Sequence, residues 1–131
     1  MGILIQGGRI VDAATGTDKT GDIYLEDGVI TEIGEKLKTR DKSDRVINAE
    51  GRLVMPGLID LHFHGCMGDD FCDNSKEAIE NIAKYEASVG VTTIAPATMT
   101  LPVEELEDIL RTAAEYKKEL HKILTPVNTI F

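Results

Sequence analysis

Hydrophobic and polar residues alternate in short runs over residues 1–54, which is the pattern of β-strands separated by turns. Asp27-Gly28 stands between two of these runs and favours a tight hairpin turn. Residues 16–21, which begin and end with glycine, are expected to form a loop. The pattern therefore predicts strands at residues 3–6, 8–12, 22–26 and 29–33, followed by an extended segment at 46–54.

From residue 55 the pattern changes to the order strand, loop and helix, which is typical of a βα repeat. An apolar strand ends at His64, and residues 91–95 predict the next strand. Between them, an N-cap within residues 73–77 begins a helix that runs to about Ser88. A longer helix starts near Pro102, and residues 125–131 are expected to form a third strand. Both helices carry an apolar stripe for packing, made of Ile79, Ile82, Ala83 and Ala87 in the first and Leu106, Ile109, Leu110, Ala113 and Ala114 in the second.

The strand that ends in His62 and His64 carries the chemistry of the chain. Side chains two residues apart on a strand point to the same face, so both imidazoles can reach one metal ion. Asp60 belongs to the same face, while the opposite face is apolar and is expected to be filled by Ile59, Leu61 and Phe63. The alternative is a pair of solvent-facing histidines that pack or form hydrogen bonds without a metal.

Other polar residues near the pair have simpler explanations than catalysis. Asp60 is expected to orient a neighbour by hydrogen bonding, and the glycines at 65 and 68 predict that Cys66 lies in a loop rather than on the metal-binding face. Cys66 and Cys72 are expected to be reduced thiols. Turn-forming or capping roles are expected for Asp69, Asp70 and Asp73, a solvent-exposed position for His121, and a place at the end of the second strand, without an assigned role, for Thr98 and Thr100.

Composition and charge exclude several classes of function. The formal net charge is −9 and there is no cluster of Lys and Arg, which disfavours nucleic acid as a partner. No apolar run is long enough to cross a bilayer, and the first residues do not resemble a signal peptide, so we expect no membrane partner and a cytoplasmic location. An anionic sugar phosphate can still bind through a local positive pocket.

The segment Leu53-Val-Met-Pro-Gly-Leu-Ile-Asp-Leu-His-Phe-His64 resembles the first barrel strand of the metal-dependent amidohydrolase superfamily. Residues 64–73, with their His-Gly-x-x-Gly-x-Asp-Phe loop, and residues 89–100, with Gly-Val-Thr-Thr, most resemble the N-acetylglucosamine-6-phosphate deacetylase branch. Dihydroorotases typically place an arginine soon after the two histidines, whereas this chain has none between Arg52 and Arg111.

The resemblance implies an α/β fold: the N-terminal part of a (β/α)8 barrel, preceded by part of a small β-sandwich domain. Residues 1–54 would belong to the sandwich, and residues 55–131 would form the first two to three βα units. His62 and His64 would bind zinc or iron, with one or two ions in the complete enzyme. By resemblance, a glutamate after the third strand, further histidines and an aspartate acid/base would follow outside this chain.

The implied reaction is deacetylation of N-acetylglucosamine 6-phosphate in amino sugar metabolism. The alternatives are a cyclic-amide hydrolase of the dihydroorotase type and a truncated, non-catalytic fragment that only self-associates. A barrel of this kind takes about 250 residues, so we expect the 131-residue chain alone to be inactive. We also expect it to form homo-oligomers, or to associate through an exposed barrel edge.

Overall fold

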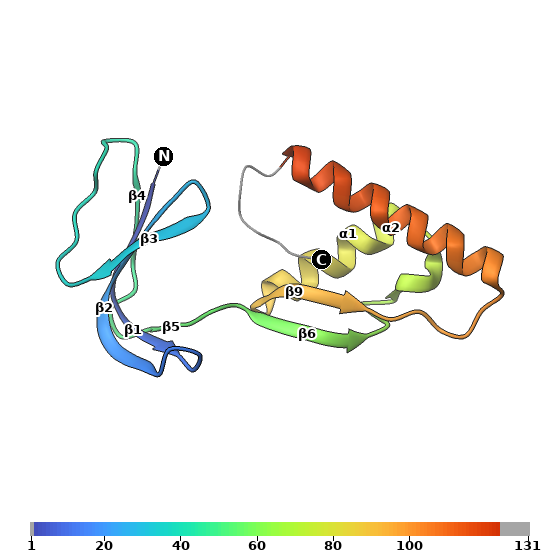
Figure 1. Cartoon of the computed structure of the whole chain (residues 1–131), viewed down its shortest axis with the longest axis horizontal. Helices are drawn as coiled ribbons and strands as arrows, with labels where there is room; N and C mark the ends of the chain where they lie inside the picture. Colours follow the sequence, from blue (N-terminus) through green and yellow to red (C-terminus); the bar gives the residue numbers. More distant parts are fainter. Residues whose placement is uncertain (1, 124–131) are drawn as a thin grey trace. The chain divides into compact units, whose positions relative to one another are not determined.

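The structure is a computed structural model that describes residues 2–123 (Figure 1). The chain forms two compact units, Met1–Pro56 and Gly57–Phe131. The third strand expected at residues 125–131 and the side chain of His121 lie outside the described part of the chain.

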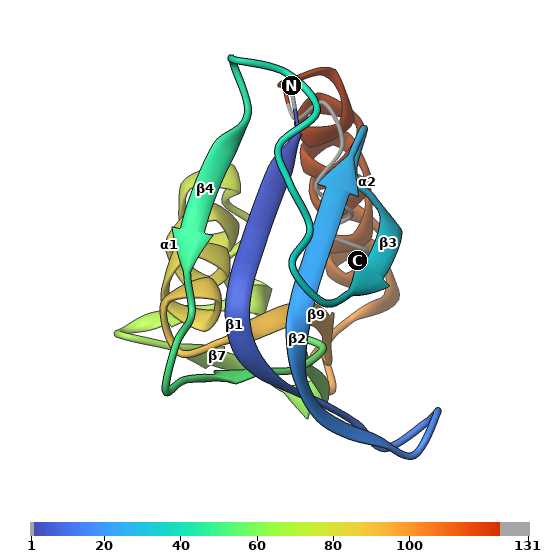
Figure 2. The same cartoon turned by 90° about the vertical axis from the view of Figure 1, so that its left-hand side faces the viewer.

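The first unit is a mixed β-sheet. Its strands are β1 (Ile3–Asp12), β2 (Thr17–Glu26), β3 (Val29–Gly34), β4 (Arg45–Asn48) and β5 (Leu53–Val54). Their order is β3-β2-β1-β4 (Figure 2). β5 also pairs with β1. β2 runs antiparallel to both β1 and β3, whereas β4 and β5 run parallel to β1.

The turns of this sheet follow the sequence at one hairpin and differ from it at another. Asp27 and Gly28 both have positive φ and join β2 to β3, as predicted. The predicted loop at residues 16–21 is wrong for most of its length, because β2 already begins at Thr17 and pairs with Asp12. Cross-strand pairing to the long β1 supplies the main-chain hydrogen bonds that extend this strand beyond its apolar run.

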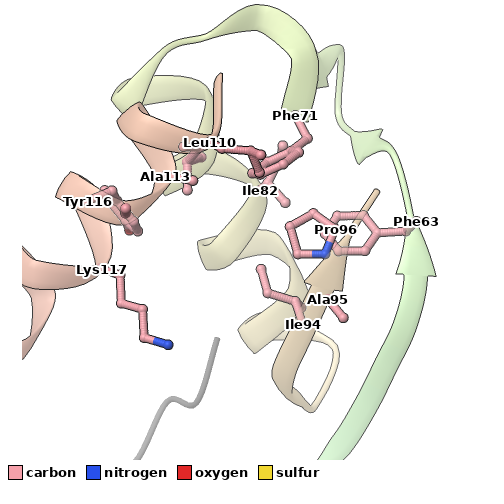
Figure 3. Close-up of a pocket in the computed structure, with 12 residues that line it drawn as sticks. Phe63, Phe71, Ile82, Ile94, Ala95, Pro96, Leu110, Ala113, Tyr116 and Lys117 are labelled. Carbon is pink, nitrogen blue, oxygen red and sulfur yellow. The ribbon is translucent and has the colours of Figure 1, made fainter. Parts of the chain in front are cut away.

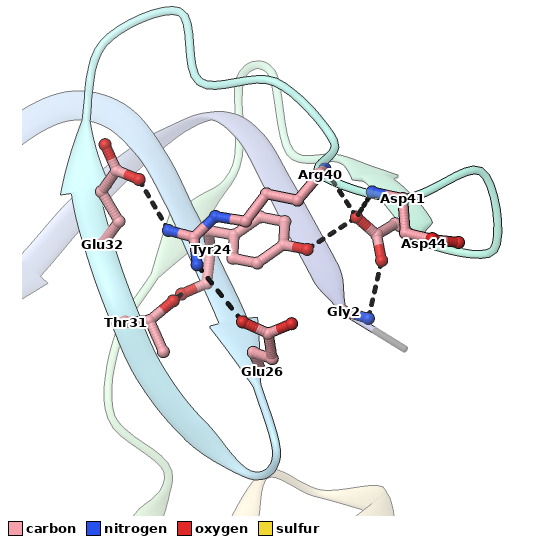
Figure 4. A network of polar contacts seen from close by, with 8 residues as sticks. All are labelled: Gly2, Tyr24, Glu26, Thr31, Glu32, Arg40, Asp41 and Asp44. Atoms are coloured by element: carbon pink, nitrogen blue, oxygen red, sulfur yellow. Dashed lines mark hydrogen bonds and ion pairs between the residues drawn. The ribbon is translucent and has the colours of Figure 1, made fainter.

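Two carboxylates tie the loops of the first unit to its sheet. Buried Asp22 accepts hydrogen bonds from the main-chain N–H of Gly7, in the bulge of β1, and of Leu37, both at 2.8 Å. Asp44 accepts from the hydroxyl of Tyr24 at 2.6 Å and from the main-chain N–H of Gly2 at 2.8 Å (Figure 4). These bonds satisfy groups that would otherwise be costly to remove from water.

Tyr24 is the centre of this network and is only 1% exposed. The guanidinium of Arg40 lies 4.2 Å from the centroid of its ring and forms ion pairs with Glu26 and Glu32 (Figure 4). The hydrogen bond to Asp44 raises the pKa of the Tyr24 phenol to about 12, and the same bond lowers the pKa of the Asp44 carboxyl. The network is therefore structural, since every group in it has a partner within the unit.

The second unit contains the predicted βα repeat. The parallel strands β6 (Leu58–Phe63) and β9 (Val91–Pro96) pair with each other, and helix α1 (Lys76–Ser88) connects them. Helix α2 (Val103–Ile123) follows β9. The side chain of Ser75 caps α1 and Gly90 follows its end with φ of 90°, so both predicted helix boundaries are confirmed.

A short hairpin replaces the loop that the glycines at 65 and 68 predict. β7 (Gly65–Cys66) pairs with β8 (Asp69–Asp70) across a turn in which Met67 and Gly68 have positive φ. A Cβ at Gly65 would overlap the main-chain oxygen of Asp69, so this close approach requires glycine. The 3-10 helix η1 (Phe71–Asp73) follows directly.

The core of the second unit lies between its helices and η1, where Phe71, Ile79, Ile109 and Tyr116 pack together. In contrast, two apolar side chains of β6 are not covered by the described residues: Ile59 is 61% exposed and Leu61 is 77% exposed. The expectation that these two side chains fill an apolar face is therefore wrong in this structure. β9 pairs with one edge of β6, and within residues 2–123 no element pairs with the other edge.

Candidate metal centre

His62 and His64 lie at the carboxyl end of β6, next to the carboxyl end of β9. Their ring centroids are 5.2 Å apart and the rings are nearly perpendicular. The two imidazoles are therefore adjacent, as the spacing predicts. In parallel α/β folds this edge of the sheet is where ligands and catalytic groups gather.

The ring of His64 is held by the strand that follows in sequence. Its Nδ1 lies 2.9 Å from the main-chain oxygen of Ala97, directly after β9. A carbonyl oxygen only accepts hydrogen bonds, so Nδ1 carries the proton and donates it. Neutral His64 then has its lone pair on Nε2, which is the arrangement of a metal-binding histidine with an outer hydrogen-bond partner.

The main chain around His64 is fixed as well. The N–H of Ala97 donates to the oxygen of Phe63 at 2.8 Å, and the N–H of Phe71 donates to the oxygen of His64 at 2.7 Å. These bonds join the end of β6 both to the end of β9 and to the start of η1. Sequence reasoning did not identify Ala97, because the group that acts is a main-chain atom, which any residue type would supply.

Asp60 acts on the main chain rather than on a metal. Its Oδ1 accepts a hydrogen bond from the N–H of His62 at 3.0 Å. The expected hydrogen-bonding role toward a neighbour is thus present, and the partner is the backbone of His62 rather than its ring. The side chain of His62 itself is exposed, while that of His64 is half-buried.

The donor set fits a metal centre in part. Two neutral imidazoles are good ligands for zinc or iron, and the His64 ring has the outer partner such ligands usually have. Among the side chains that the structure describes, no group of three or more His, Cys, Asp and Glu is placed to hold an ion. A catalytic centre needs about three protein ligands, so the pair would supply only part of the set.

The remaining candidates have structural roles or none. Asp70 caps η1, and the carboxylate of Asp73 accepts from the N–H of Asp70 at 2.8 Å, which confirms the capping expectation for these two residues. Cys66 and Cys72 are free thiols. Burial raises the pKa of Cys66, with a smaller contribution from nearby Glu86, and the Sγ of Cys72 accepts from the N–H of Met99 at 3.2 Å.

Thr98 and Thr100 follow β9, as expected from their place in the sequence. Thr98 is half-buried and Thr100 is exposed. Asp69 lies in β8, where it pairs with Cys66 across the hairpin. None of these three side chains is placed in a hydrogen bond with the histidines.

A pocket of about 260 Å³ lies between the sheet and the helices of the second unit (Figure 3). Phe63, Ile94 and Pro96 line it from the strands, and Ile82, Leu110 and Ala113 line it from the helices. Phe63 points to the face of β6 opposite the two histidines, since neighbouring side chains alternate along a strand. This apolar pocket is therefore packing space between layers, separate from the candidate metal centre.

Comparison with known proteins identifies the family. The family model described as amidohydrolase family matches residues 45–129. The chain belongs to the amidohydrolase family. Among curated relatives, dihydroorotases from Geobacter metallireducens and Halalkalibacterium halodurans are 38% and 44% identical to it over 80% of the chain. The chain spans about a quarter of their length, 24% and 23% respectively.

Solved structures with a similar fold include two deacetylases. N-acetylglucosamine-6-phosphate deacetylase from Pasteurella multocida matches with a TM-score of 0.80 at 21% identity, over 91% of this chain and 31% of that one. The deacetylase from Thermotoga maritima matches with a TM-score of 0.72 at 28% identity, over 88% of this chain and 28% of that one. The α/β fold, as the N-terminal part of a barrel hydrolase, is thereby confirmed.

The match to this family agrees with the resemblance that residues 53–64 show in the sequence. None of the helices in the described part of the chain combines the length and apolar character needed to pass through a lipid bilayer.

Proposed function

We propose that the protein containing this chain is a metal-dependent hydrolase of a cyclic amide, of the dihydroorotase type. The observation that carries the proposal is the 38–44% identity to dihydroorotases over about four fifths of the chain. The site supports it, because two adjacent imidazoles lie where parallel strands end.

In this proposal His62 and His64 bind divalent metal, which is zinc or iron. The complete centre would contain one or two such ions. Such an ion, when bound, would polarise the amide carbonyl and lower the pKa of water, which would make water a competent nucleophile near neutral pH. The residues of this chain contribute binding and orientation. Asp60 fixes the main chain of His62, the carbonyl of Ala97 fixes the ring of His64, and the N–H of Ala97 fixes the carbonyl of Phe63.

Deacetylation of N-acetylglucosamine 6-phosphate is a second candidate, and a specific observation favours it. The segment after the histidines is a tight hairpin with Gly65 and Cys66 in β7, and no arginine occurs between Arg52 and Arg111. Dihydroorotases typically carry an arginine shortly after the pair. The two deacetylase structures described above add support, and the substrate would then be an anionic amino sugar in place of a cyclic amide.

We also propose that the 131-residue chain has no turnover by itself, because the described residues offer too few metal ligands. Its partner would be a small-molecule substrate rather than nucleic acid or membrane, and the open edge of β6 would favour self-association. A cytoplasmic location is supported by the two free thiols, which are typical of a reducing compartment.

The test compares two reactions on the purified protein that contains this chain, supplied with Zn²⁺ or Fe²⁺. Ring opening of dihydroorotate supports the first proposal, and release of acetate from N-acetylglucosamine 6-phosphate supports the second. A His62→Ala/His64→Ala variant should abolish either activity. Turnover that survives the double substitution, or a full-length protein that is metal-loaded and inactive on both substrates, would contradict the proposal.

A further inference from the structure

The two histidines of the candidate centre are held unequally. His64 is half-buried, and its Nδ1 donates to the oxygen of Ala97 at 2.9 Å. His62 is exposed, and within residues 2–123 its ring contacts that of His64 without forming a hydrogen bond of its own. One imidazole is therefore already oriented before any ligand arrives, while the other is free to turn.

The residue that orients His64 is itself held through its main-chain N–H. The N–H of Ala97 donates to the oxygen of Phe63 at 2.8 Å, so the residue just before His64 holds the residue whose carbonyl holds the His64 ring. This closed set of bonds joins the ends of β6 and β9. A movement of Ala97 would therefore change the main chain and the ring of His64 together.

We propose that the main-chain carbonyl of Ala97 is a positioning group for the metal centre: it keeps the proton of His64 on Nδ1 and leaves Nε2 as the nitrogen that binds the ion. This inference rests on the proposed function in one respect only, which is that the ligand bound by Nε2 is a metal ion. The tautomer itself follows from the hydrogen bond. Within the described part of the chain His62 has no such partner, and it would contribute the adaptable ligand.

The first test measures tautomers directly in the metal-free 131-residue chain. Long-range ¹H–¹⁵N NMR spectra are recorded above the titration range of the imidazoles, with signals assigned from His62→Ala and His64→Ala variants. We expect His64 in the Nδ1–H form alone and His62 as a mixture of both forms. Addition of Zn²⁺ should then shift the Nε2 signal of His64. An Nε2–H form of His64, or binding of Zn²⁺ through its Nδ1, would overturn the proposal.

The second test moves the positioning group. In Ala97→Pro the proline ring would occupy the place from which the N–H now donates to Phe63, so that hydrogen bond is lost and residue 97, with its carbonyl, must shift. Ala97→Ser keeps both main-chain groups and is the matched control. We expect the proline variant to lose the single tautomer of His64 and about 10–100-fold in Zn²⁺ affinity, the usual effect of losing an outer partner. The serine variant should change neither.

Circular dichroism shows whether the proline variant retains its fold. If this variant is unfolded, the tautomer measurement on the unmodified chain decides the proposal. A folded Ala97→Pro variant with an unchanged tautomer and unchanged Zn²⁺ affinity would refute the role of Ala97. Neither the tautomer measurement nor the Zn²⁺ affinity depends on enzymatic turnover. Failure to hydrolyse either substrate would therefore count against the proposed function and leave the positioning role to be judged by NMR.

Discussion

The unit Met1–Pro56 and the unit Gly57–Phe131 both expose apolar side chains on one strand, but these strands differ in what else they carry. β3 exposes Val29, Ile30 and Ile33 at one edge of the sheet and bears no candidate for chemistry. β6 exposes Leu61 and contains His62, and His64 follows directly after its end. The candidate centre thus lies on a strand whose packing is incomplete within the described residues.

The two units also differ in how polar groups are used. In the first, Asp22 and Asp44 accept main-chain hydrogen bonds that close loops onto the sheet. In the second, the hydrogen bonds around His64 hold a side chain whose Nε2 remains available. The comparison shows that similar short polar contacts close loops in one unit and orient an imidazole in the other.

The largest expected effect concerns the histidines themselves. Replacing both in His62→Ala/His64→Ala removes the two proposed ligands, so Zn²⁺ affinity should fall by more than about 100-fold, beyond the usual loss from an outer partner. Isothermal calorimetry on the chain measures this, with His121→Ala as the control histidine. Equal loss of affinity in the control would mean that the pair is not the binding site.

The next effect tests how tightly the hairpin after His64 is built. Gly65→Ala introduces a Cβ that overlaps the oxygen of Asp69 and lies 2.7 Å from the Cα of Asp70. We expect destabilisation by about 1–3 kcal/mol, as for other overpacked sites. Gly68→Ala has open space around its Cβ but a φ of 93°, so strain of about 1–2 kcal/mol is expected. Urea unfolding of both variants compares crowding with backbone strain.

A third effect is confined to the first unit and depends on pH. The folded-state pKa of Asp44 is lowered, chiefly by the hydrogen bond from Tyr24, so its contribution is present above the ordinary carboxyl pKa of about 3.9. This stability is lost as pH falls through the lowered value. Asp44→Asn should therefore melt with less dependence on pH below about 3.9 than the unmodified chain. Thermal melts followed by circular dichroism from neutral to strongly acidic pH measure this, and parallel curves for both proteins would contradict it.

The same hydrogen bond has a second consequence in alkali. The pKa of Tyr24 is raised to about 12, so its contribution is complete below the ordinary phenol pKa of about 10 and is lost as pH rises through 12. Tyr24→Phe should remove this alkaline loss. Melting temperatures between pH 9 and 12 test it, with Tyr85→Phe as the control for a phenol outside the network.

The smallest expected effect concerns association of the chain. A lysine in Leu61→Lys places a charge on the exposed strand β6, which should shift the chain toward monomer if that strand associates. Val29→Lys makes the matching change on β3 of the first unit. Sedimentation velocity measures the fraction of monomer for both variants. A larger increase in monomer from Val29→Lys would mean that the first unit, rather than β6, mediates association.

Much of this protein could be predicted from local sequence. Asp27-Gly28 fixed a hairpin because both residues tolerate positive φ, and Ser75 and Gly90 bounded α1 for reasons of capping. The i and i+2 spacing placed His62 and His64 side by side because strand geometry allows little else.

Other features were beyond local reasoning. Residues 17–21 became part of β2 because a partner strand was available, and Gly65-Cys66 became a strand because Asp69-Asp70 folded back onto it. Ile59 and Leu61 were expected to be covered, yet burial depends on which elements lie opposite rather than on the residue itself.

The sequence by itself determined the family, the order β6, α1, β9 and α2 in the second unit, and the pair of imidazoles, since these depend on residue type and short-range periodicity. Only the tertiary structure decided that His64 is held by the carbonyl of Ala97 while the ring of His62 is not held in this way. The physical reason is that a main-chain carbonyl has no signature in the sequence, and its position depends on the pairing of β6 with β9, whose residues lie about thirty positions apart.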